Sequence, residues 1–330
     1  LKQIAIFCNI SCFFKTNLFL YKSSMSILNQ KTINKKISFE GIGLHTGKHV
    51  NLHLLPSEPN TGITFKRIDL KSNNIVIPTY DNVIDTTLCT TLSNDYGVKV
   101  STIEHLMGAL YGLGIDNLIV EVDSQELPIL DGSAKIFVEK ILSAGIKSSS
   151  SPIKLIKINK KVSLQEGKKS ISLDVSRVAS EIDFEINYNN ELISTQRNKV
   201  NIFNDELENI FESRTFCLYE DVEKLKKAGL AKGGSLDNAI VVGKEEILNK
   251  SGLRNSKEFV NHKILDCMGD LYLSGYRIVG SLTTSQGGHG LTNKILKKLF
   301  SDKSNFTVIE IKEKTLPYQI LDRSYLKSIA

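Results

Sequence analysis

Apolar and polar residues alternate along several short segments near the start of the chain, and this alternation predicts β-strands. The clearest are "KISFEGIGL", "HVNLHLLP" and "GITFKRID", which have turn residues between them. The period then changes in "STIEHLMGALYGLG", where apolar residues recur at helical spacing and the segment ends in glycine. The alternating segment "NLIVEVD" follows. This part of the chain is therefore predicted to run from strands to a helix and back to a strand.

The second part of the chain repeats this order. Strand-like stretches occupy residues 153–188, a charged helix is expected near residues 219–229, and a long helix near residues 255–274 is ended by Gly275. The strand-like segment "YRIVGSL" comes next. The shared order predicts an α+β fold of two similar two-layer α/β sandwich domains that face each other, with the active site between them.

The serine-rich run "AGIKSSSSPIK" is typical of a linker and indicates a domain boundary near residue 150. The expected division is a dispensable extension at residues 1–30, a first sandwich domain at 31–148, a second at 149–315 and a C-terminal tail at 316–330.

Composition and charge argue against a nucleic-acid-binding protein. The 330-residue chain is 41% hydrophobic and 24% charged, which is ordinary for a soluble globular protein. Its net charge of +6 arises at the N-terminal end, because residues 1–36 hold six lysines and no acid, which leaves 36 basic and 36 acidic residues elsewhere. A nucleic-acid-binding protein usually carries a basic stripe on its folded part. We therefore expect no nucleic-acid partner.

The N-terminal residues 1–24 are apolar but are interrupted by Asn9 and Lys15, so no run approaches the roughly 20 apolar residues that cross a bilayer. They lack a clear small-residue cleavage site and the arginines of an organellar transit peptide. We expect upstream sequence or a dispensable extension here, and no stable membrane anchor. The five cysteines are odd in number and show no CxxC spacing, which favours free thiols in a reducing compartment.

The long helix carries the first candidate chemistry. In "FVNHKILDCMGDLY" the polar residues His262, Asp266 and Asp270 fall on one narrow stripe, and the opposite side is apolar. A catalytic zinc ion usually takes three protein ligands, and His262 and Asp266 would supply two from one rigid element. The alternative is a surface contact or a satisfied core pair. Asp270 is either an exposed helix residue or a group that orients a catalytic side chain.

Two further histidines offer related chemistry. His105, on the first predicted helix, is a candidate third ligand, and the adjacent Glu104 would reach the reacting water as a general base. Glu104 would instead be occupied if it formed a capping box with Ser101. His289, in "QGGHGLTN", is a candidate acid or charge stabiliser or else an ordinary turn residue.

Seven stretches together resemble the zinc-dependent UDP-3-O-acyl-N-acetylglucosamine deacetylases, which perform the committed step of lipid A synthesis. They span roughly residues 33–300. The stretches are "FEGIGLHTGKHV", "DTTLCTTL", "VSTIEHLMGAL", "GIDNLIVEVDSQELPILDGSA", "SRTFCLYEDVEKLKKAGLAKGGSLDNAIVV", "EFVNHKILDCMGDLYLSG" and "GGHGLTN".

The resemblance implies a role for individual residues. Zn²⁺, with Fe²⁺ as an alternative, would be held by His105, His262 and Asp266. The general base would be Glu104. The other implied catalytic residues are Thr215 as an oxyanion donor, His289 as a protonated histidine held by Asp270, and Lys263 as a contact to the polar part of the substrate.

The resemblance also implies an insert in the second domain through which the acyl chain of the substrate passes. By position, Leu44 and Phe216 would contact that chain. Val222, Ala239 and Val241 are candidates that are equally explained as plain core residues. Each methylene that the chain buries would contribute about 0.8 kcal/mol.

Taken together, these features lead us to expect a cytoplasmic, monomeric zinc amide hydrolase. Its substrate would be UDP-3-O-(3-hydroxyacyl)-N-acetylglucosamine, and its products the free amine and acetate. A zinc amidase for another acetylated sugar is one alternative. A non-catalytic RNA-binding α+β protein is a second, of another class, and the charge-neutral body argues against it.

Overall fold

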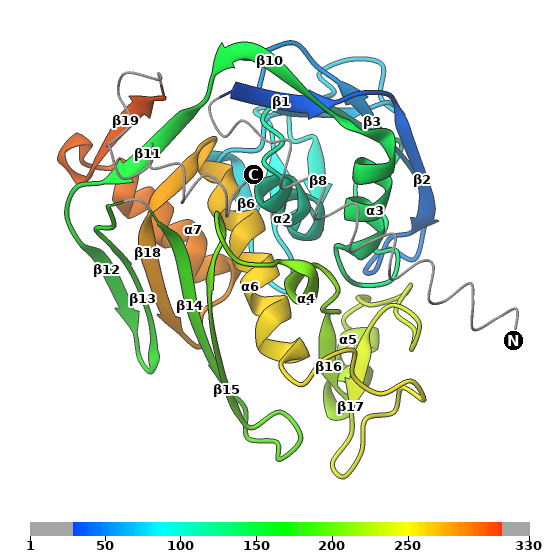
Figure 1. Cartoon of the computed structure of the whole chain (residues 1–330). Helices are drawn as coiled ribbons and strands as arrows, with labels where there is room; N and C mark the ends of the chain where they lie inside the picture. Colours follow the sequence, from blue (N-terminus) through cyan, green and yellow to red (C-terminus); the bar gives the residue numbers. More distant parts are fainter. Residues whose placement is uncertain (1–28, 178, 312–330) are drawn as a thin grey trace, which may run out of the picture.

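The computed structural model describes residues 29–177 and 179–311 (Figure 1). It has the mixed helices and sheets of the predicted α+β class. The predicted extension, apart from its last two residues, and the predicted C-terminal tail lie outside the described residues. None of the helices in the described ranges is long and apolar enough to cross a membrane.

A five-stranded sheet forms the frame of the first half. In β3 and β4, buried side chains alternate with less buried ones, as the sequence pattern predicts. Helix α3 (Lys135–Ala144), which was not predicted, packs on it through Phe137, whose ring centroid lies 5.0 Å from that of Phe39. The order in the sheet is β2 (Ile37–Ile42), β3 (His49–Pro56), β9 (Leu118–Val122), β4 (Ile63–Arg67) and β5 (Ile75–Val76).

A small three-stranded sheet leads from this frame into helix α2 (Glu104–Leu113). The helix ends at Gly114, which adopts a left-handed conformation at φ 68°. The strands of the small sheet are β6 (Val83–Asp85), β7 (Thr91–Ser93) and β8 (Lys99–Ser101), and the 3₁₀ helix η1 (Tyr80–Asn82) precedes them.

A seven-stranded sheet forms the frame of the second half. Strand β18 (Arg277–Ser285) pairs with β13, β11 and β14 and so lies at its centre. Helices α6 (Glu258–Leu271) and α7 (His289–Phe300) pack on this sheet. The other strands are β11 (Lys154–Ile158), β12 (Val162–Glu166), β13 (Lys169–Asp174), β14 (Ser180–Asn187), β15 (Thr195–Asn201) and β19 (Phe306–Glu310); the short helices are α4 (Glu208–Phe211), η2 (Tyr272–Ser274) and η3 (Lys303–Asn305).

The serine-rich run that was predicted as a linker is a strand, so that prediction of local structure is wrong. Residues Ile146–Pro152 form β10, which pairs antiparallel with β1 (Asn29–Ile33) and crosses the top of the view in Figure 1. Serine is acceptable there because several of the side chains face solvent. The pairing also brings Asn29 and Gln30, assigned to the extension, into the fold.

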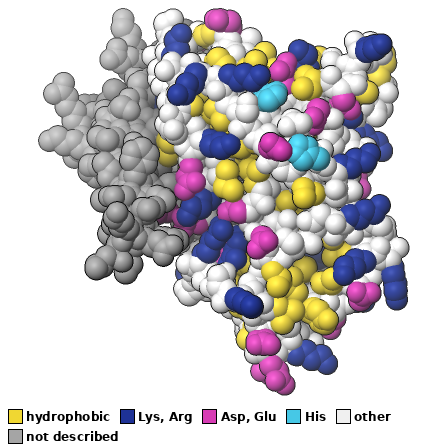
Figure 2. Space-filling view, turned by 90° about the vertical axis from the view of Figure 1, so that its right-hand side faces the viewer, with side chains coloured by type: hydrophobic (Ala, Val, Ile, Leu, Met, Phe, Trp, Pro, Cys, Tyr) yellow, Lys and Arg dark blue, Asp and Glu magenta, His cyan; other side chains and the backbone are white. Residues whose placement is uncertain are grey.

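A β-α-β insert lies at the lower right of Figure 1. Strands β16 (Phe216–Leu218) and β17 (Ile240–Val242) pair in parallel, and α5 (Tyr219–Lys227) follows the first of them. Figure 2 shows hydrophobic side chains gathered on the lower part of the surface. In the insert, Tyr219 and Leu236 are exposed. Over the rest of that face, basic and acidic side chains are interspersed.

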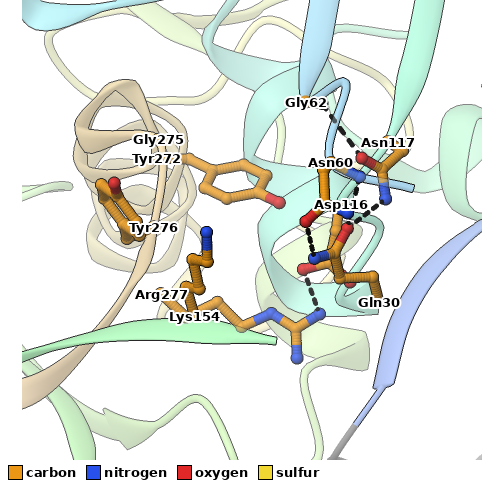
Figure 3. Close-up of a pocket in the computed structure, with 10 residues that line it drawn as sticks. All are labelled: Gln30, Asn60, Gly62, Asp116, Asn117, Lys154, Tyr272, Gly275, Tyr276 and Arg277. Carbon is orange, nitrogen blue, oxygen red and sulfur yellow. Dashed lines mark hydrogen bonds and ion pairs between the residues drawn. The ribbon is translucent and has the colours of Figure 1, made fainter. Parts of the chain in front are cut away.

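A polar pocket of about 210 Å³ lies at the C-terminal ends of α2 and α6, where the two halves meet (Figure 3). Its polar groups bond largely to one another. The Gln30 amide donates to the Asn60 side chain at 2.8 Å and accepts from Asn117 at 3.0 Å. The Arg277 guanidinium donates to Asp116 at 2.7 Å and to the Gly114 carbonyl at 2.6 Å. We interpret this pocket as a structural junction between the halves.

The substitution Asp116→Ala tests this junction. It leaves the buried Arg277 guanidinium without its carboxylate, and removing one partner of a buried ion pair costs about 3–5 kcal/mol. We expect the free energy of unfolding in urea to fall by about that amount. The matched control Glu166→Ala breaks the exposed pair with Lys294 and should leave the unfolding midpoint nearly unchanged. Equal effects of the two substitutions would contradict this reading.

Candidate active site

Glycines let helices α2 and α6 approach each other closely at the centre of the molecule (Figure 1). A Cβ atom on Gly269 would collide with the Glu104 carbonyl oxygen, and one on Gly108 would lie 2.8 Å from the Leu265 carbonyl oxygen. Only glycine leaves room for this contact between backbones. Side chains from the first turn of α2 and from the facing side of α6 are therefore brought together.

The predicted metal ligands meet at this contact. His105 on α2 and His262 and Asp266 on α6 place their ligand atoms within 4.8 Å of one another. The Nε2 atoms of His105 and His262 lie 3.6 and 3.4 Å from Oδ1 of Asp266. Ligands bound tetrahedrally at about 2.0–2.2 Å are roughly 3.3–3.6 Å apart. The observed spacing therefore fits one small divalent cation.

The hydrogen bonds around these residues also fit a metal. Oδ1 of Asp266 is buried and has no hydrogen-bond partner among the described residues, whereas Oδ2 accepts from Lys263 Nζ at 2.8 Å. Nδ1 of His262 lies 3.1 Å from the Ser213 carbonyl oxygen and donates to it, which turns Nε2 toward Asp266. A buried acceptor without a partner is costly. A cation held between this oxygen and the two imidazoles would remove that cost.

Protonation states favour the same interpretation. Burial lowers the pKa of His262 to about 3, so its imidazole is neutral at physiological pH, as a metal ligand requires. Burial acts to raise the pKa of Asp266, but neighbours that include the Lys263 ammonium hold it well below its ordinary value. Asp266 is therefore a carboxylate.

Glu104 opens helix α2, and its carboxylate is not used as a helix cap. The capping box with Ser101, the alternative role for Glu104, does not form, because Ser101 belongs to β8 and Ile103, which caps the helix, makes no side-chain bond. Oε2 of Glu104 instead accepts the Thr90 N–H at 3.1 Å. Burial raises the pKa of Glu104, and the adjacent histidines, His289 first, oppose this rise.

His289 lies at the start of α7, on the other side of Glu104. Its Nδ1 lies 2.7 Å from Oδ2 of Asp270, and its Nε2 lies 4.0 Å from Oε1 of Glu104. Oδ1 of Asp270 accepts the Thr90 hydroxyl at 2.6 Å. Burial opposes protonation of His289, but the carboxylates of Asp270, Glu104 and Asp266, Asp270 foremost, together outweigh burial and raise the pKa to about 10. His289 is thus a cation in the neutral pH range.

The remaining predicted site residues come from two other parts of the chain. Phe216 begins β16, with its ring centroid 6.4 Å from that of His262 and 5.7 Å from Lys263 Nζ. Thr215 precedes it and is half buried. Leu44 lies in the turn between β2 and β3, and its carbonyl accepts the Gly233 N–H at 3.0 Å.

The weaker acyl-chain candidates lie in the insert. Val222 on α5 and Val241 on β17 are half buried, and Ala239, just before β17, is 9% exposed. Their burial fits packing within the insert and also fits contact with an acyl chain.

The comparisons with known proteins identify the family. The family model LpxC, described as UDP-3-O-acyl N-acetylglycosamine deacetylase, matches residues 30–301. The chain belongs to this family. LpxC enzymes are metal-dependent amide hydrolases, and the resemblance found in the sequence is confirmed.

Relatives similar to this LpxC family member are named as deacetylases of the same kind. The UDP-3-O-acyl-N-acetylglucosamine deacetylase of Haemophilus ducreyi is 44% identical over 284 residues, which cover 84% of this chain and 92% of the relative. That of Myxococcus xanthus is 44% identical over 295 residues, covering 88% and 92%. That of Actinobacillus pleuropneumoniae serotype 3 is 42% identical over 294 residues, covering 87% and 95%.

The sequence reasoning missed two residues that support the site. Thr90 binds both Glu104 and Asp270, and the Ser213 carbonyl orients His262. Thr90 lies in the stretch "DTTLCTTL", but the sequence of that stretch does not indicate which carboxylates it binds. Nothing in the sequence marks a backbone carbonyl such as that of Ser213.

The substitution Gly269→Ala tests whether helix contact builds the site in this LpxC family member. The added methyl group must push α2 away from α6, so we expect zinc affinity to fall at least tenfold. The control Gly275→Ala adds a methyl group that meets nothing within 4 Å but is strained at φ 75°. It should cost about 1–2 kcal/mol of stability and leave zinc affinity unchanged. Unchanged affinity in Gly269→Ala, measured by competition with a chelator, would contradict the account.

Proposed function

We propose that the chain hydrolyses the acetamide of UDP-3-O-(3-hydroxyacyl)-N-acetylglucosamine to the free amine and acetate, the committed step of lipid A synthesis. The observation that carries this proposal is the convergence of His105, His262 and Asp266, from two distant parts of the chain, beside the buried Glu104. Membership of the LpxC family favours this substrate over another acetylated sugar and over RNA.

In this proposal His105, His262 and Asp266 hold the metal. We assign zinc, with ferrous iron as the alternative that the same ligands accept. When bound, such a cation polarises the amide carbonyl and lowers the pKa of a water molecule beside it. Lys263 neutralises the second oxygen of Asp266 at 2.8 Å and presents the rest of its ammonium to polar groups of the substrate.

The remaining residues handle protons and charge. Glu104 takes the proton of the attacking water, since burial gives its carboxylate a raised pKa that suits a general base. The Thr215 hydroxyl donates to the carbonyl oxygen as negative charge develops there. His289, kept cationic by Asp270, faces the same charge and is one of two groups, with Glu104, that can return a proton to the leaving amine.

The acyl chain anchors the substrate. In our proposal it passes Leu44 and Phe216 into the β-α-β insert, where Val222, Ala239 and Val241 are further candidates. Each buried methylene contributes about 0.8 kcal/mol, so a long chain compensates for the small size of the reacting acetyl group.

The setting of the reaction is also part of the proposal. We place the enzyme in the cytoplasm as a monomer, with domains at residues 31–148 and 149–315. Free thiols at Cys89, Cys217 and Cys267 support a reducing compartment. The five- and three-stranded sheets use residues 37–122 and the seven-stranded sheet uses residues 154–310, which supports two domains, and β10 (Ile146–Pro152) spans the boundary between them.

Paired substitutions separate metal binding from catalysis. Glu104→Gln should retain about one zinc per chain by metal analysis and lose about 10²–10⁴-fold in kcat for acetate release, because the general base is gone. Asp266→Ala should lose zinc affinity by at least the roughly 10–100-fold that removal of a supporting group costs. The proposal fails if Glu104→Gln keeps wild-type turnover or if Asp266→Ala binds zinc as tightly as the wild type.

The pH dependence tests the cation at His289. Its folded pKa of about 10 keeps it protonated below that pH, and activity that needs the cation is lost as pH rises through the pKa. Asp270→Asn removes the charge that raises this pKa, so the alkaline limb of the kcat profile should move to lower pH by at least about one unit. A limb that stays in place would show that His289 is not the titrating group.

A further inference from the structure

A tight turn between β2 and β3 carries Leu44 and touches the insert. The Gly47 N–H donates to the Gly43 carbonyl and the Gly43 N–H to the Lys48 carbonyl, both at 2.9 Å. On the insert side, the Gly233 N–H donates to the Leu44 carbonyl at 3.0 Å. The turn therefore lies between the first-half sheet and the glycine-rich segment that precedes β17.

One buried carboxylate holds this turn. Glu126 is 0% exposed, and its two oxygens accept four hydrogen bonds. The backbone N–H groups of His45 and Thr46 donate at 2.8 Å, and the Thr46 hydroxyl donates at 2.6 Å. Hydrogen bonds to an ionised group are among the stronger ones in proteins, and the loss of a buried one is costly.

The fourth bond links the turn to the helix that carries Glu104 and His105. The Thr102 hydroxyl donates to Oε1 of Glu126 at 3.1 Å. Thr102 lies just before α2 and adopts a left-handed conformation at φ 56°, which is uncommon for a β-branched residue. The same carboxylate thus fixes both the turn that carries Leu44 and the entry to α2.

The sequence of the turn fits this clamp. A Cβ atom on Gly43 would collide with Oε2 of Glu126, so glycine is needed for the carboxylate to reach the turn. Both ring nitrogens of His45 are buried and have no hydrogen-bond partner among the described residues. Buried polar atoms of this kind usually find a partner. The turn therefore carries a buried imidazole whose nitrogens no described residue satisfies, next to the apolar side chain of Leu44.

We propose that Glu126 is a positioning residue that holds Leu44 and His45 in place for the substrate without touching it, and so sets how tightly the acylated sugar binds. The inference rests on the proposed function. Glu126 belongs to neither the metal ligands nor the proton-transfer groups, so its loss should weaken substrate binding more than it slows the chemical step.

The test compares Glu126→Gln with the wild type in acetate release. The amide replaces one acceptor with a donor that faces the donors of the turn, so we expect KM to rise about tenfold or more, with kcat within about threefold and zinc content unchanged. Glu126→Asp keeps the charge, so its KM should lie between those of Glu126→Gln and the wild type. Thr46→Val removes the hydroxyl, which donates to Glu126 and accepts the Lys48 N–H at 3.4 Å, but keeps the backbone bonds to Glu126. It should raise KM less than Glu126→Gln, and Thr46→Ser should restore the wild-type KM.

The remote variant Asp116→Ala serves as the control for lost stability. It should lower stability and leave KM unchanged. A KM for Glu126→Gln equal to that of the wild type would overturn the proposal, whether the variant loses stability alone, as in the control, or loses kcat as well. If Glu126→Gln does not fold, the KM values of Thr46→Val and Thr46→Ser decide: equal KM values in Thr46→Val and the wild type would overturn the proposal. Absence of acetate release in the wild type would instead contradict the proposed function, so the two failures are distinguishable.

Discussion

The close contact between α2 and α6 is the constraint on which the rest of the structure depends. Each helix belongs to a different half of the chain, and glycines at positions 108 and 269 let the backbones approach until the carbonyl of Glu104 fills the space beside Gly269. That approach creates the shared site, since His105 comes from one helix and His262 and Asp266 from the other. The polar junction of Arg277 and Asp116 holds the opposite ends of the same two helices together.

The electrostatics of the site follow from its burial. Three carboxylates, those of Glu104, Asp266 and Asp270, lie within a few residues of the helix contact and are almost fully buried. Such charges are retained only when they are paired or bind a metal. Asp270 is paired with the cationic His289 and Asp266 with Lys263. Oδ1 of Asp266, which has no hydrogen-bond partner among the described residues, is left to bind a metal. Glu104, whose pKa is raised, is left to act as a base.

Much of this arrangement could be predicted from the sequence, because periodicity determines the side of each element on which a residue lies. The stripe of His262, Asp266 and Asp270 and the alternating strands follow directly from spacing. The pairing of β10 with β1 could not be predicted, since a serine-rich strand resembles a linker until its partner is known. No capping box forms at Ser101, because Ser101 ends β8 and the left-handed residue Thr102 separates it from α2. The contribution of Glu126 depends on contacts 80 residues away in the chain.

The most direct test of the central claim is the position of the metal in a crystal of the active, zinc-loaded protein, measured by anomalous scattering at the zinc edge. The account predicts a single strong peak about 2.0–2.2 Å from Nε2 of His105, Nε2 of His262 and Oδ1 of Asp266. A peak bound instead by Glu104, His289 or Cys89, or bound by ligands from only one of the two helices, would contradict it.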